Sequence, residues 1–568
     1  MKRFLTIFLA ITLLFSCFAG CGGNPSDNTG TPSGPSAPDT PETPEVPDTP
    51  EVPDEPEQKS AYEIYKETYN YNGTEEEWIL DITNGLIGAP KKHTVTFTFP
   101  EVDFDDVVVE VQHRDKIPTP ELPERIGYAV NGWTYTDGEE VRAWDLEQGV
   151  TSDLTLVANW DYVTKELPII NINTDGAEIN SKIDYTTMTF SIENCESVLS
   201  EVTGGIRLRG NSTLNFPKKP YRIKFDKKQS LFGLEKAKSW VLLADYLDST
   251  GIYNYSAMSL GKEMPGLAFT TTPHKVNVYL NGEFQGLYTL CEQVQENEGR
   301  MNIEMDEITE DMTKLTDFNF YISLDGKSKS DPDAVKDETY FIIERPDKAE
   351  DQWWCFELKY PEKDDFCSDA QFRSFFSQLR SYVENLLIDF EEKNVEAIKS
   401  QVNVESLVDY LIVDQLMGER DHAFYSFNMY YTNTSSPEEN GKLNFGPIWD
   451  YDRCLFTKNS AEPNQQYENY YAKDMVWKSG NPFYAPFYTT PELLNIVKQR
   501  YNFYGVPALE KYLAKLDSVI ESVKVSTELN RQLWYSEFDA EIVIKNNEFL
   551  KSFFLDRKRI LDRDWSLN

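Results

Sequence analysis

Hydrophobic and polar residues change their spacing several times along the chain, and each change predicts a different kind of element. Residues 60–88 carry apolar side chains at helical spacing, with an acidic helix start at Glu75. Between residues 93 and 161 apolar residues alternate with polar ones, as in HTVTFTF and DLTLVANW, which is typical of strands. The pattern therefore predicts a short helical module over residues 59–90 and a small β module over residues 91–162.

A second group of strands is predicted after residue 163. The segments LPIININ, TTMTFSIEN and GGIRLRGNST have strand patterns, and the last one ends in a polar turn that contains glycine. The next strand, KPYRIKF, alternates apolar residues with Arg222 and Lys224, so the two cations share one face. Backbone amides and cations on one side of a strand-turn-strand can cover phosphate groups. A basic strand face that is simply solvated is the alternative interpretation.

A hairpin is predicted by KVNVYLNGEFQGLYTLCEQV, with a tight turn at Asn281 and Gly282. Its second strand leads to Glu292. In a two-lobed nucleotide enzyme that position would approach the segment beside the adenine. A solvent-exposed glutamate at a hairpin edge is an equally good interpretation of the pattern alone.

A buried helix is predicted by VESLVDYLIVDQLMG, in which apolar residues recur at helical spacing. Asn403 is a candidate N-cap, because its side-chain oxygen can accept from a free backbone N–H group. Gly418 is a typical stop signal. Further helical patterns follow near the C-terminus, as in PELLNIVKQRYNFYG and ALEKYLAKLDSVIESVKV, and they predict a region rich in helices.

Candidate chemistry follows the buried helix in a defined order. Asp421 lies on the loop that leaves the helix, Asn428 comes after it, and a predicted hairpin then delivers Asp450 and Asp452. Phosphoryl transfer uses a carboxylate that orients the attacking hydroxyl or accepts its proton, and an amide with a second carboxylate that holds magnesium against the phosphates. Each aspartate alone is more often a loop or capping residue, but the ordered set favours a phosphoryl-transfer site.

Composition supports a large folded body and argues against nucleic acid as a partner. The chain has 568 residues, of which 40% are hydrophobic and 13% aromatic, so it can bury a large core. Its formal net charge is −40, and a polyanion would be repelled by such a field.

The N-terminus resembles a bacterial lipoprotein signal over residues 1–21. Two basic residues precede an apolar run from Phe4 to Phe15, and small residues lead to Cys21 in FAGCGG. The run is shorter than the ~20 residues of a transmembrane helix. The resemblance implies acylation of the Cys21 thiol after cleavage and a location at the extracellular face of the bacterial cytoplasmic membrane. Cleavage before Cys17 and a plain secretory signal are the alternatives.

Residues 22–58 are dominated by Pro, Glu, Asp, Thr and Ser, a composition that cannot form a core. Prolines occupy every third position from Pro32 to Pro56, which would place them along one edge of a polyproline II helix. We expect a disordered, extended stalk on the order of 100 Å long, at about 3.1 Å per residue. A docking ligand for a proline-recognition module is the weaker alternative.

Five cysteines remain after the signal, widely spaced and without a zinc pattern. An odd number leaves at least one thiol unpaired. We expect mostly buried free thiols, with Cys355 and Cys367 as the one candidate disulfide.

The β module resembles the Listeria-Bacteroides repeat, a small β-grasp-like module of cell-surface proteins. The resemblance lies in ERIGYAVNGWTYTDGEEV and DLTLVANW, with Gly127 and Tyr128, Gly132 and Trp133. Only one copy is present. The resemblance implies a spacer or a weak adhesion role.

Residues 163–568 resemble the spore coat protein H (CotH) kinase family, which are secreted atypical protein kinases. RGNST, FPKKPYRIKF, NGEFQGLYTLCE and GPIWDYD are its recurrent motifs and occur here in order. The resemblance implies an α+β, two-lobed atypical protein-kinase-like fold, with an N-lobe over about 163–300 and a helical C-lobe over about 301–568. It also implies ATP with Mg²⁺ or Mn²⁺, and transfer of the γ-phosphoryl group to Ser or Thr of extracellular or cell-surface proteins.

Site residues are carried over by motif. The resemblance implies that Asp421 is the catalytic aspartate and that Asp450 is the principal metal ligand, assisted by Asn428 and Asp452. Among the cations, Lys224 is the kinase-like choice for the phosphate-binding lysine. The candidate nucleotide contacts are Arg209, Asn211, Lys219, Arg222, Lys224 and Glu292.

One departure from the family pattern leaves two hypotheses. The family usually has asparagine two residues before the catalytic aspartate, where this chain has Glu419, and Arg420 follows. The first hypothesis is a monomeric ATP-dependent Ser/Thr kinase, tethered to the membrane by its lipid, that acts on a surface protein. The alternative is a catalytically inactive kinase-like surface protein for adhesion or for binding of cell-wall glycans.

Overall fold

The computed structural model describes most of the chain beyond residue 58. The described residues are 59–86, 88–329, 334–346, 348–350, 353–419, 421–433, 441–454, 481–535 and 540–567. The predicted signal peptide over 1–21, its lipidation site Cys21 and the stalk over 22–58 lie outside them, as does Arg420. None of the described helices is long and apolar enough to cross a membrane.

The chain divides into two compact units, residues 1–68 and 69–568. In the first unit the described part is the start of helix α1 (Ala61–Tyr69). The second unit begins with helix α2 (Glu75–Thr83), where Thr74 and Glu77 form a reciprocal capping box that satisfies two free N–H groups. The acidic helix start predicted at Glu75 is therefore confirmed.

The β module is a five-stranded sheet in the order β2-β1-β5-β3-β4. Its core consists of alternate residues of the strands, such as Val95, Phe97 and Leu156, which are fully buried. Its strands are β1 (Lys92–Thr98), β2 (Val107–Gln112), β3 (Tyr128–Asp137), β4 (Glu140–Trp144) and β5 (Leu154–Tyr162).

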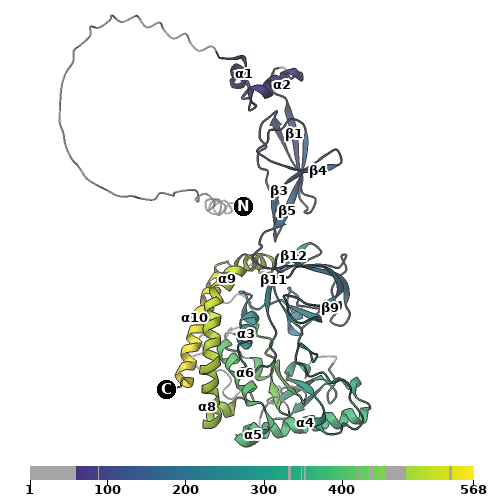
Figure 1. Ribbon diagram of the computed structural model, residues 1–568, viewed down its shortest axis with the longest axis vertical. Coiled ribbons are helices and arrows are strands. Elements are labelled where there is room, and N and C mark those ends of the chain that lie inside the picture. Colours follow the sequence, from purple (N-terminus) through teal and green to yellow (C-terminus); the bar gives the residue numbers. More distant parts are fainter. Residues whose placement is uncertain are drawn as a thin grey trace, which may run out of the picture. The chain divides into compact units, whose positions relative to one another are not determined.

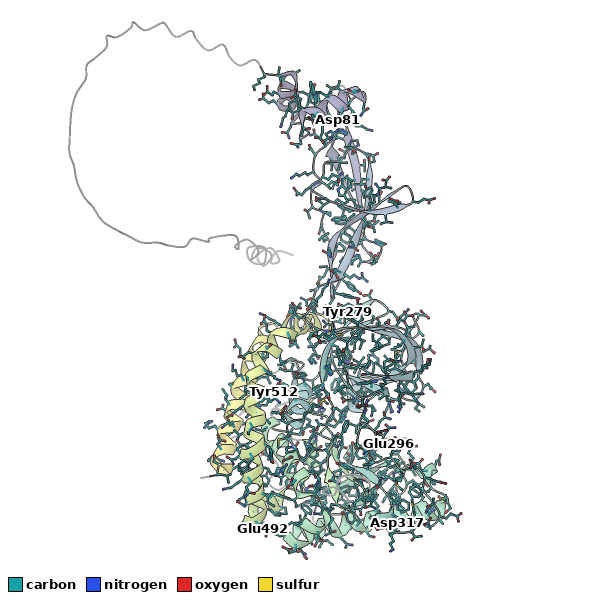
Figure 2. The ribbon with its side chains drawn as sticks, viewed as in Figure 1. Asp81, Tyr279, Glu296, Asp317, Glu492 and Tyr512 are labelled. Carbon is teal, nitrogen blue, oxygen red and sulfur yellow. The ribbon has the colours of Figure 1, made fainter. Side chains whose placement is uncertain are left out.

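A buried polar cluster joins α2 to this sheet. Asp81 (labelled in Figure 2) accepts from the Tyr71 hydroxyl at 2.6 Å and from Arg114 Nε at 2.6 Å. His113 Nε2 lies 3.1 Å from the same carboxylate, and its Nδ1 lies 2.8 Å from His93 Nε2. The cluster explains why a short helical segment that buries little apolar surface stays packed on the module.

The histidine pair of this cluster should make the β module less stable in mild acid. Burial lowers the pKa of His93, and the neighbouring His113 and Lys91 lower it further, while Asp153 opposes them. Because the folded state then binds fewer protons than the unfolded state, this contribution is present above the ordinary histidine pKa of about 6.5 and is lost as the pH falls below it. Hydrogen exchange in β1 and β2, corrected for intrinsic rates, should show more frequent opening at about pH 5 than at about pH 7.5.

The variant His93→Gln is the control for this prediction, because it cannot titrate. It should remove the pH dependence of the opening. If His93→Gln opens as much in acid as the wild type does, a titratable group other than His93 causes the effect.

The next seven strands close into a barrel in the order β10-β12-β11-β6-β7-β8-β9. Its interior is filled by large apolar side chains such as Ile223, Trp240 and Tyr288, all fully buried. Helix α3 (Tyr253–Gly261) follows β10, and a 3₁₀ turn (Ser212–Asn215) lies between β8 and β9. The strands are β6 (Ile169–Asn173), β7 (Thr186–Glu193), β8 (Leu199–Leu208), β9 (Tyr221–Gln229), β10 (Ala237–Leu243), β11 (His274–Leu280) and β12 (Glu283–Glu292).

Two local predictions in the barrel are confirmed. Asn281 and Gly282 have φ values of +52° and +81° between the paired residues Leu280 and Glu283, which is the turn geometry that Asn-Gly favours. In β9 the apolar residues point into the barrel, while Arg222 and Lys224 lie on its outer side.

A second sheet and most of the helices form the rest of the chain. The sheet is antiparallel, in the order β14-β15-β13-β16-β17, and it shares one large core with the helices. The mixed α+β class is therefore confirmed. The elements are β13 (Phe320–Leu324), β14 (Tyr340–Ile343), β15 (Trp354–Tyr360), α4 (Asp369–Glu391), α5 (Val395–Gln401), α6 (Val404–Met417), β16 (Phe427–Tyr431), β17 (Leu443–Phe445), α7 (Ala485–Thr489), α8 (Pro491–Arg500), a π turn (Tyr501–Gly505), α9 (Val506–Trp534) and α10 (Ala540–Trp565).

Helix α6 has the ends that the sequence predicts. The side chain of Asn403 accepts from Ser406 N at 3.3 Å, and Gly418 ends the helix with a φ of +62°. Twelve consecutive residues from Ser406 to Met417 are buried, so the helix crosses the core and delivers the following loop from a rigid support.

Helix α9 reaches back to the barrel and runs beside α10 (Figure 1). Near its end, Asn530 accepts from Leu287 N at 3.3 Å and Trp534 Nε1 donates to Gln285 O at 2.9 Å, both on β12. Tyr512 (Figure 2), earlier in α9, shares a 2.5 Å hydrogen bond with Ser256 of α3. The C-terminal helix pair therefore ties the barrel to the helical part.

The β module also contacts the barrel, through the residues that carry its repeat resemblance. The Tyr128 hydroxyl donates to Gly282 O and the Tyr279 hydroxyl donates to Gly127 O, each at 2.9 Å. Gly127 has a φ of +87°, and a Cβ there would lie 2.7 Å from Phe284 Cβ. Glycine is thus required for this close approach.

The predicted disulfide is absent. All five cysteines in the described part of the chain are free, including Cys355 and Cys367, so their predicted pairing is wrong. Cys355 is buried in β15, whereas Cys367 is exposed and its thiol donates to Ile308 O at 3.0 Å. The sequence alone left this pair as a candidate. In the fold, Cys355 lies in the core and Cys367 lies at the surface.

Candidate active-site cleft

A cleft of about 420 Å³ is lined by five separate parts of the chain. The parts are the β8–β9 loop with Arg222, the segment that follows β12, strand β13 with the residue after it, Lys359 and Glu362 at the end of β15, and the residues around Asn428 and Asp450. These parts are far apart in sequence and meet only because the barrel and the second sheet face the same space. Most of the side chains that line it are polar or charged.

Two arginines form the cationic wall of this cleft. Burial lowers the pKa of both Arg209 and Arg222, and the charges of Asp450 and Asp452 partly restore that of Arg209. The Arg209 guanidinium carbon lies 5.3 Å from the centre of the Trp449 ring. Arg222 Nε is buried and has no hydrogen-bond partner among the described residues. A desolvated cation with an unused donor is a suitable contact for an anionic ligand.

The β8–β9 loop brings backbone groups to the same wall. Gly210 has a φ of +90°, and a side chain there would collide with Thr213 Oγ1, so only glycine fits. Asn211 lines the cleft, and its Oδ1 accepts from Lys182 at 2.8 Å. The RGNST motif therefore forms a tight turn that presents Ser212 to the cleft.

Asp450 and Asn428 also line the cleft. Asp450 has a φ of +70°, a left-handed conformation that is sparsely populated outside glycine, and its Oδ2 accepts from Ser426 at 2.9 Å. Asn428 donates to Pro447 O at 2.9 Å, and its Oδ1 accepts from the Tyr321 hydroxyl at 2.8 Å. That oxygen keeps a second lone pair.

Asp421 and Asp452 lie just outside the cavity lining. Asp421 begins a 3₁₀ turn (Asp421–Ala423), its N–H donates to Glu419 Oε1 at 2.5 Å, and its carboxylate lies 3.7 Å from Arg453. No three His, Cys, Asp or Glu side chains in the described segments are close enough to form a ready metal cage. Magnesium commonly uses one or two carboxylates together with substrate phosphates, so the arrangement suits that ion better than a structural metal.

A family comparison agrees with this geometry. The model of the CotH kinase protein family matches residues 206–561, well over half of the chain. This chain belongs to the CotH kinase family. The match contains the loop with Arg209, the buried helix α6 and the segment with Asp450. No curated protein matches the chain.

A buried network supports the two acidic loops of this CotH family member. His422 Nδ1 donates to Asp414 Oδ1 at 2.9 Å, and its Nε2 donates to Trp449 O at 2.9 Å. Asp414 also accepts from the hydroxyls of Tyr451 and Tyr484 at 2.7 Å and 2.6 Å. Asp414 of helix α6 therefore holds His422, the residue after Asp421, and His422 in turn holds the main chain of Trp449, the residue before Asp450.

The charge state of this network follows from its geometry. Burial lowers the pKa of His422, but Asp414 and Glu419 outweigh it and raise the pKa to about 10. The imidazole is thus a cation at neutral pH, in agreement with donation from both nitrogens. Burial raises the pKa of Glu419 to about 8, with His422 opposing the rise. Glu419 is fully buried, and its Oε1 accepts from the backbone N–H of Asp421.

Two of the lysines expected at the phosphates lie elsewhere. Lys219 donates to Leu214 O at 2.7 Å and to Phe216 O at 2.6 Å, so its ammonium stabilises its own loop. Lys224 is exposed, and its Nζ lies 5.9 Å from the centre of the Tyr185 ring. Neither residue lines the cleft, although Lys224 shares a strand face with Arg222, because a residue two positions along a twisted strand faces a different part of the surface.

Glu292 is buried rather than exposed, and it lines a different cavity, of about 240 Å³. Its Oε2 accepts from Thr272 N at 2.6 Å. The solvent-exposed hairpin edge is therefore wrong, and the role of Glu292 as a nucleotide contact stays a prediction. Its neighbours after β12, from Gln293 to Glu296, line the cleft instead.

Strand β13 contributes cleft residues that the sequence analysis missed. Tyr321 and Ser323 on the strand and Asp325 directly after it line the cleft, and Ser323 and Asp325 are buried. Glu296 (Figure 2), which follows β12, is a further carboxylate that lines the cleft, and burial raises its pKa. The alternation in FNFYISLD predicts a strand. That pattern alone could not show which face would meet Asn428.

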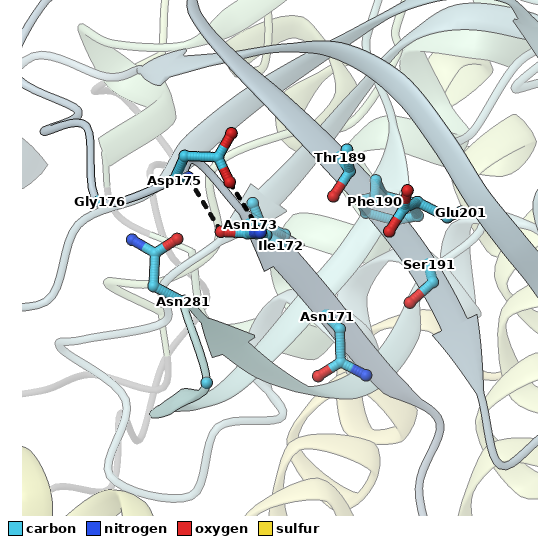
Figure 3. A pocket seen from close by; sticks show the side chains of 11 residues that line it. Asn171, Ile172, Asn173, Asp175, Gly176, Thr189, Phe190, Ser191, Glu201 and Asn281 are labelled. Atoms are coloured by element: carbon cyan, nitrogen blue, oxygen red, sulfur yellow. Dashed lines mark hydrogen bonds between the residues drawn. The ribbon is translucent and has the colours of Figure 1, made fainter. Parts of the chain in front are cut away.

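A second hollow, of about 410 Å³, lies on the barrel surface and has a polar lining (Figure 3). Asp175 N donates to Asn173 Oδ1 at 2.9 Å, and Asn173 Nδ2 donates to Asp175 Oδ1 at 3.1 Å. The described lining has no arginine or lysine, so it does not suit a phosphate group.

Proposed function

We propose that this chain is an ATP-dependent protein kinase that transfers the γ-phosphoryl group to serine or threonine of extracellular or cell-surface proteins. The observation that carries the proposal is the lining of one cleft by the cations Arg209 and Arg222 and by Asp450 and Asn428. Polyphosphate needs cations on its oxygens, and a carboxylate with an amide suits the accompanying metal. Membership of a kinase family supports the same chemistry.

The donor set fits ATP with Mg²⁺ or Mn²⁺. The unused Nε of Arg222 is a buried donor for a phosphate oxygen, and the tight turn at Gly210 lets main-chain groups approach it. Asp450 would hold the metal, with Asn428 and Asp452 assisting. When bound, the ion would neutralise charge on the phosphates.

The side chains of this chain then divide the reaction between them. Asp421 accepts the proton of the substrate hydroxyl. At the same time the oxygen of that hydroxyl bonds to the γ-phosphorus, and the bond between the γ-phosphorus and the bridging oxygen breaks, so that this oxygen leaves with ADP. Glu419 holds the backbone of Asp421, which gives a positioning role to the residue that departs from the family pattern. Arg209 and Arg222 stabilise charge on the phosphate oxygens.

The proposed place of action rests on the sequence. A lipoprotein signal ending at Cys21 and the Pro-rich stalk would tether a monomeric enzyme outside the cytoplasmic membrane, within reach of surface proteins. The β module would act as a spacer between the stalk and the enzyme.

Arg222→Met should weaken ATP binding and phosphoryl transfer, because it removes a partly buried cation from the phosphates. Lys224→Met is the matched control on the same strand, and it should behave like the wild type. Transfer of label from γ-labelled ATP to a serine-containing peptide, with Mg²⁺ or Mn²⁺, measures the effect. We expect a loss of about tenfold or more for Arg222→Met.

The outcomes separate the two hypotheses. Transfer by the wild type that is reduced only in Arg222→Met supports the kinase. Equal losses in both variants would contradict the assigned phosphate wall. No transfer and no metal-dependent ATP binding by the wild type would favour the inactive surface protein for adhesion or glycan binding.

A further inference from the structure

Asn254 of α3 lies at the point where the barrel meets the acidic loop. It is 4% exposed, and both ends of its amide are used. Its Oδ1 accepts from Tyr451 N at 2.9 Å, and its Nδ2 donates to Asp245 Oδ1 at 2.9 Å. The first of these bonds reaches the peptide group that joins Asp450 to Tyr451.

That peptide group sets the direction of the proposed metal ligand. Asp450 has a φ of +70°, and such a conformation persists only when its surroundings hold it. The residues on either side are held from the helical part, because His422 binds Trp449 O and Asp414 binds the Tyr451 hydroxyl. The hydrogen bond from Tyr451 N to Asn254 is the matching restraint from the other side of the loop.

Asn254 is itself held by a buried ion pair of the barrel. Asp245 Oδ2 lies 3.1 Å from Lys275 Nζ and accepts from Thr289 Oγ1 at 2.5 Å. The Lys275 and Asp245 side chains are 3% and 1% exposed, so this anchor is rigid and shielded from solvent. A continuous chain of hydrogen bonds therefore runs from β11 and β12 through Asn254 to the backbone between Asp450 and Asp452.

We infer that Asn254 is a positioning residue that aims Asp450 at the phosphates and couples the barrel to metal binding. The inference rests on the proposed function, since it concerns the same site. Asn254 does not line the cleft and so acts through Tyr451 N. If the bond is lost, the left-handed turn at Asp450 loses its main-chain restraint from α3, and the carboxylate, to which Ser426 still donates, should lose part of its preset direction.

The test compares Asn254→Ala with a matched control in the full chain. Asn319 is 2% exposed, donates to Ile303 O at 3.0 Å and accepts from Asn433 N at 2.9 Å, so it has the same kind of bonds outside the cleft. The measurements are Mn²⁺ binding in the presence of a non-hydrolysable ATP analogue, by electron paramagnetic resonance, and hydrogen exchange of the segment 448–454.

Asn254→Ala should weaken Mn²⁺ binding about tenfold and speed exchange at Tyr451. Asn319→Ala should lower thermal stability but should change neither Mn²⁺ binding nor hydrogen exchange at Tyr451.

Hydrogen exchange at Tyr451 tests the positioning role of Asn254 independently of activity. If Asn254→Ala leaves exchange at Tyr451 as in Asn319→Ala, the positioning role is wrong. If the wild type does not bind Mn²⁺ with the nucleotide, the proposed function fails, while faster exchange in Asn254→Ala would still support the restraint on Asp450.

Discussion

Replacing Asp450 by asparagine is expected to abolish metal-dependent nucleotide binding, whereas Asp421→Asn is expected to retain it and to lose phosphoryl transfer. The reason is the different placement of the two carboxylates. Asp450 lines the cleft, so its loss should remove the proposed principal ligand for the metal. Asp421, on the loop after α6, is not among the lining residues and has the proposed role of accepting the proton of the substrate hydroxyl, so its loss should slow transfer about a thousandfold.

Both variants should fold, because asparagine tolerates the left-handed backbone of Asp450 and the turn at Asp421. The measurements are Mn²⁺ titration with ATP and transfer of the labelled γ-phosphoryl group. Asp337→Asn is the matched control: Asp337 also has a positive φ, of +62°, but it is exposed and is not among the residues that line the cleft. It should match the wild type in both assays.

Two results would contradict these assignments. If Asp450→Asn binds Mn²⁺ with ATP as tightly as the wild type does, Asp450 is not a metal ligand. Unchanged transfer by both variants would remove the proposed kinase site itself.

The largest loss of stability is expected for His422→Ala. His422 is the cationic partner of Asp414, and both side chains are fully buried. Removal of one partner leaves an uncompensated charge in the core, which costs about 3 kcal/mol or more in free energy of unfolding. Trp449 O and two tyrosine hydroxyls belong to the same network, so the variant should also loosen the segment before Asp450.

The pH dependence of this effect has a defined sign. The folded-state pKa of His422 is raised to about 10, above the ordinary value of 6.5. The ion pair therefore contributes its full stability below about pH 6.5, and this contribution is lost as the pH rises through about 10. Urea unfolding of the wild type should show this decline between about pH 7 and 10. The decline should be smaller in His422→Ala, where Glu419, whose pKa is raised to about 8, still contributes a decline of the same sign.

His274→Ala is the control for the pH series. Burial lowers the pKa of His274 to about 4, so this residue is neutral in the same range and its ring stacks on Phe232 at 4.2 Å. Its loss should lower stability by a similar amount at pH 7 and at pH 10. The double variant Asp414→Asn with His422→Ala should be more stable than His422→Ala alone, because the buried charge is removed. Equal stability of the two would show that the charge is compensated elsewhere.

The elements that sequence predicted best are those whose signals are local. The caps of α6 at Asn403 and Gly418, the Asn-Gly hairpin at Asn281 and the capping box of α2 each depend on a few neighbouring residues. Asn428 and Asp450, which follow one helix and one hairpin in the sequence, line the cleft for the same reason, whereas the catalytic role of Asp421, which is not among the lining residues, stays a prediction.

The cationic side was predicted less well. Arg209, Arg222, Lys219 and Lys224 are equivalent by charge and neighbourhood in the sequence. Barrel closure and the path of the β8–β9 loop place two of them in the cleft, direct Lys219 to its own loop, and leave Lys224 in solvent. Long-range strand pairing decides this outcome, and no local pattern contains it.

The sequence by itself therefore determined the α+β class, the family, and the residue types available for phosphate and metal. Only the tertiary structure decided which cations are desolvated, that β13 supplies Asp325 to the cleft, and that Asn254 meets the backbone beside Asp450. Local propensities depend on residues a few positions apart. A functional cleft depends on distances between segments that are separated by hundreds of residues, and packing of the whole core sets those distances.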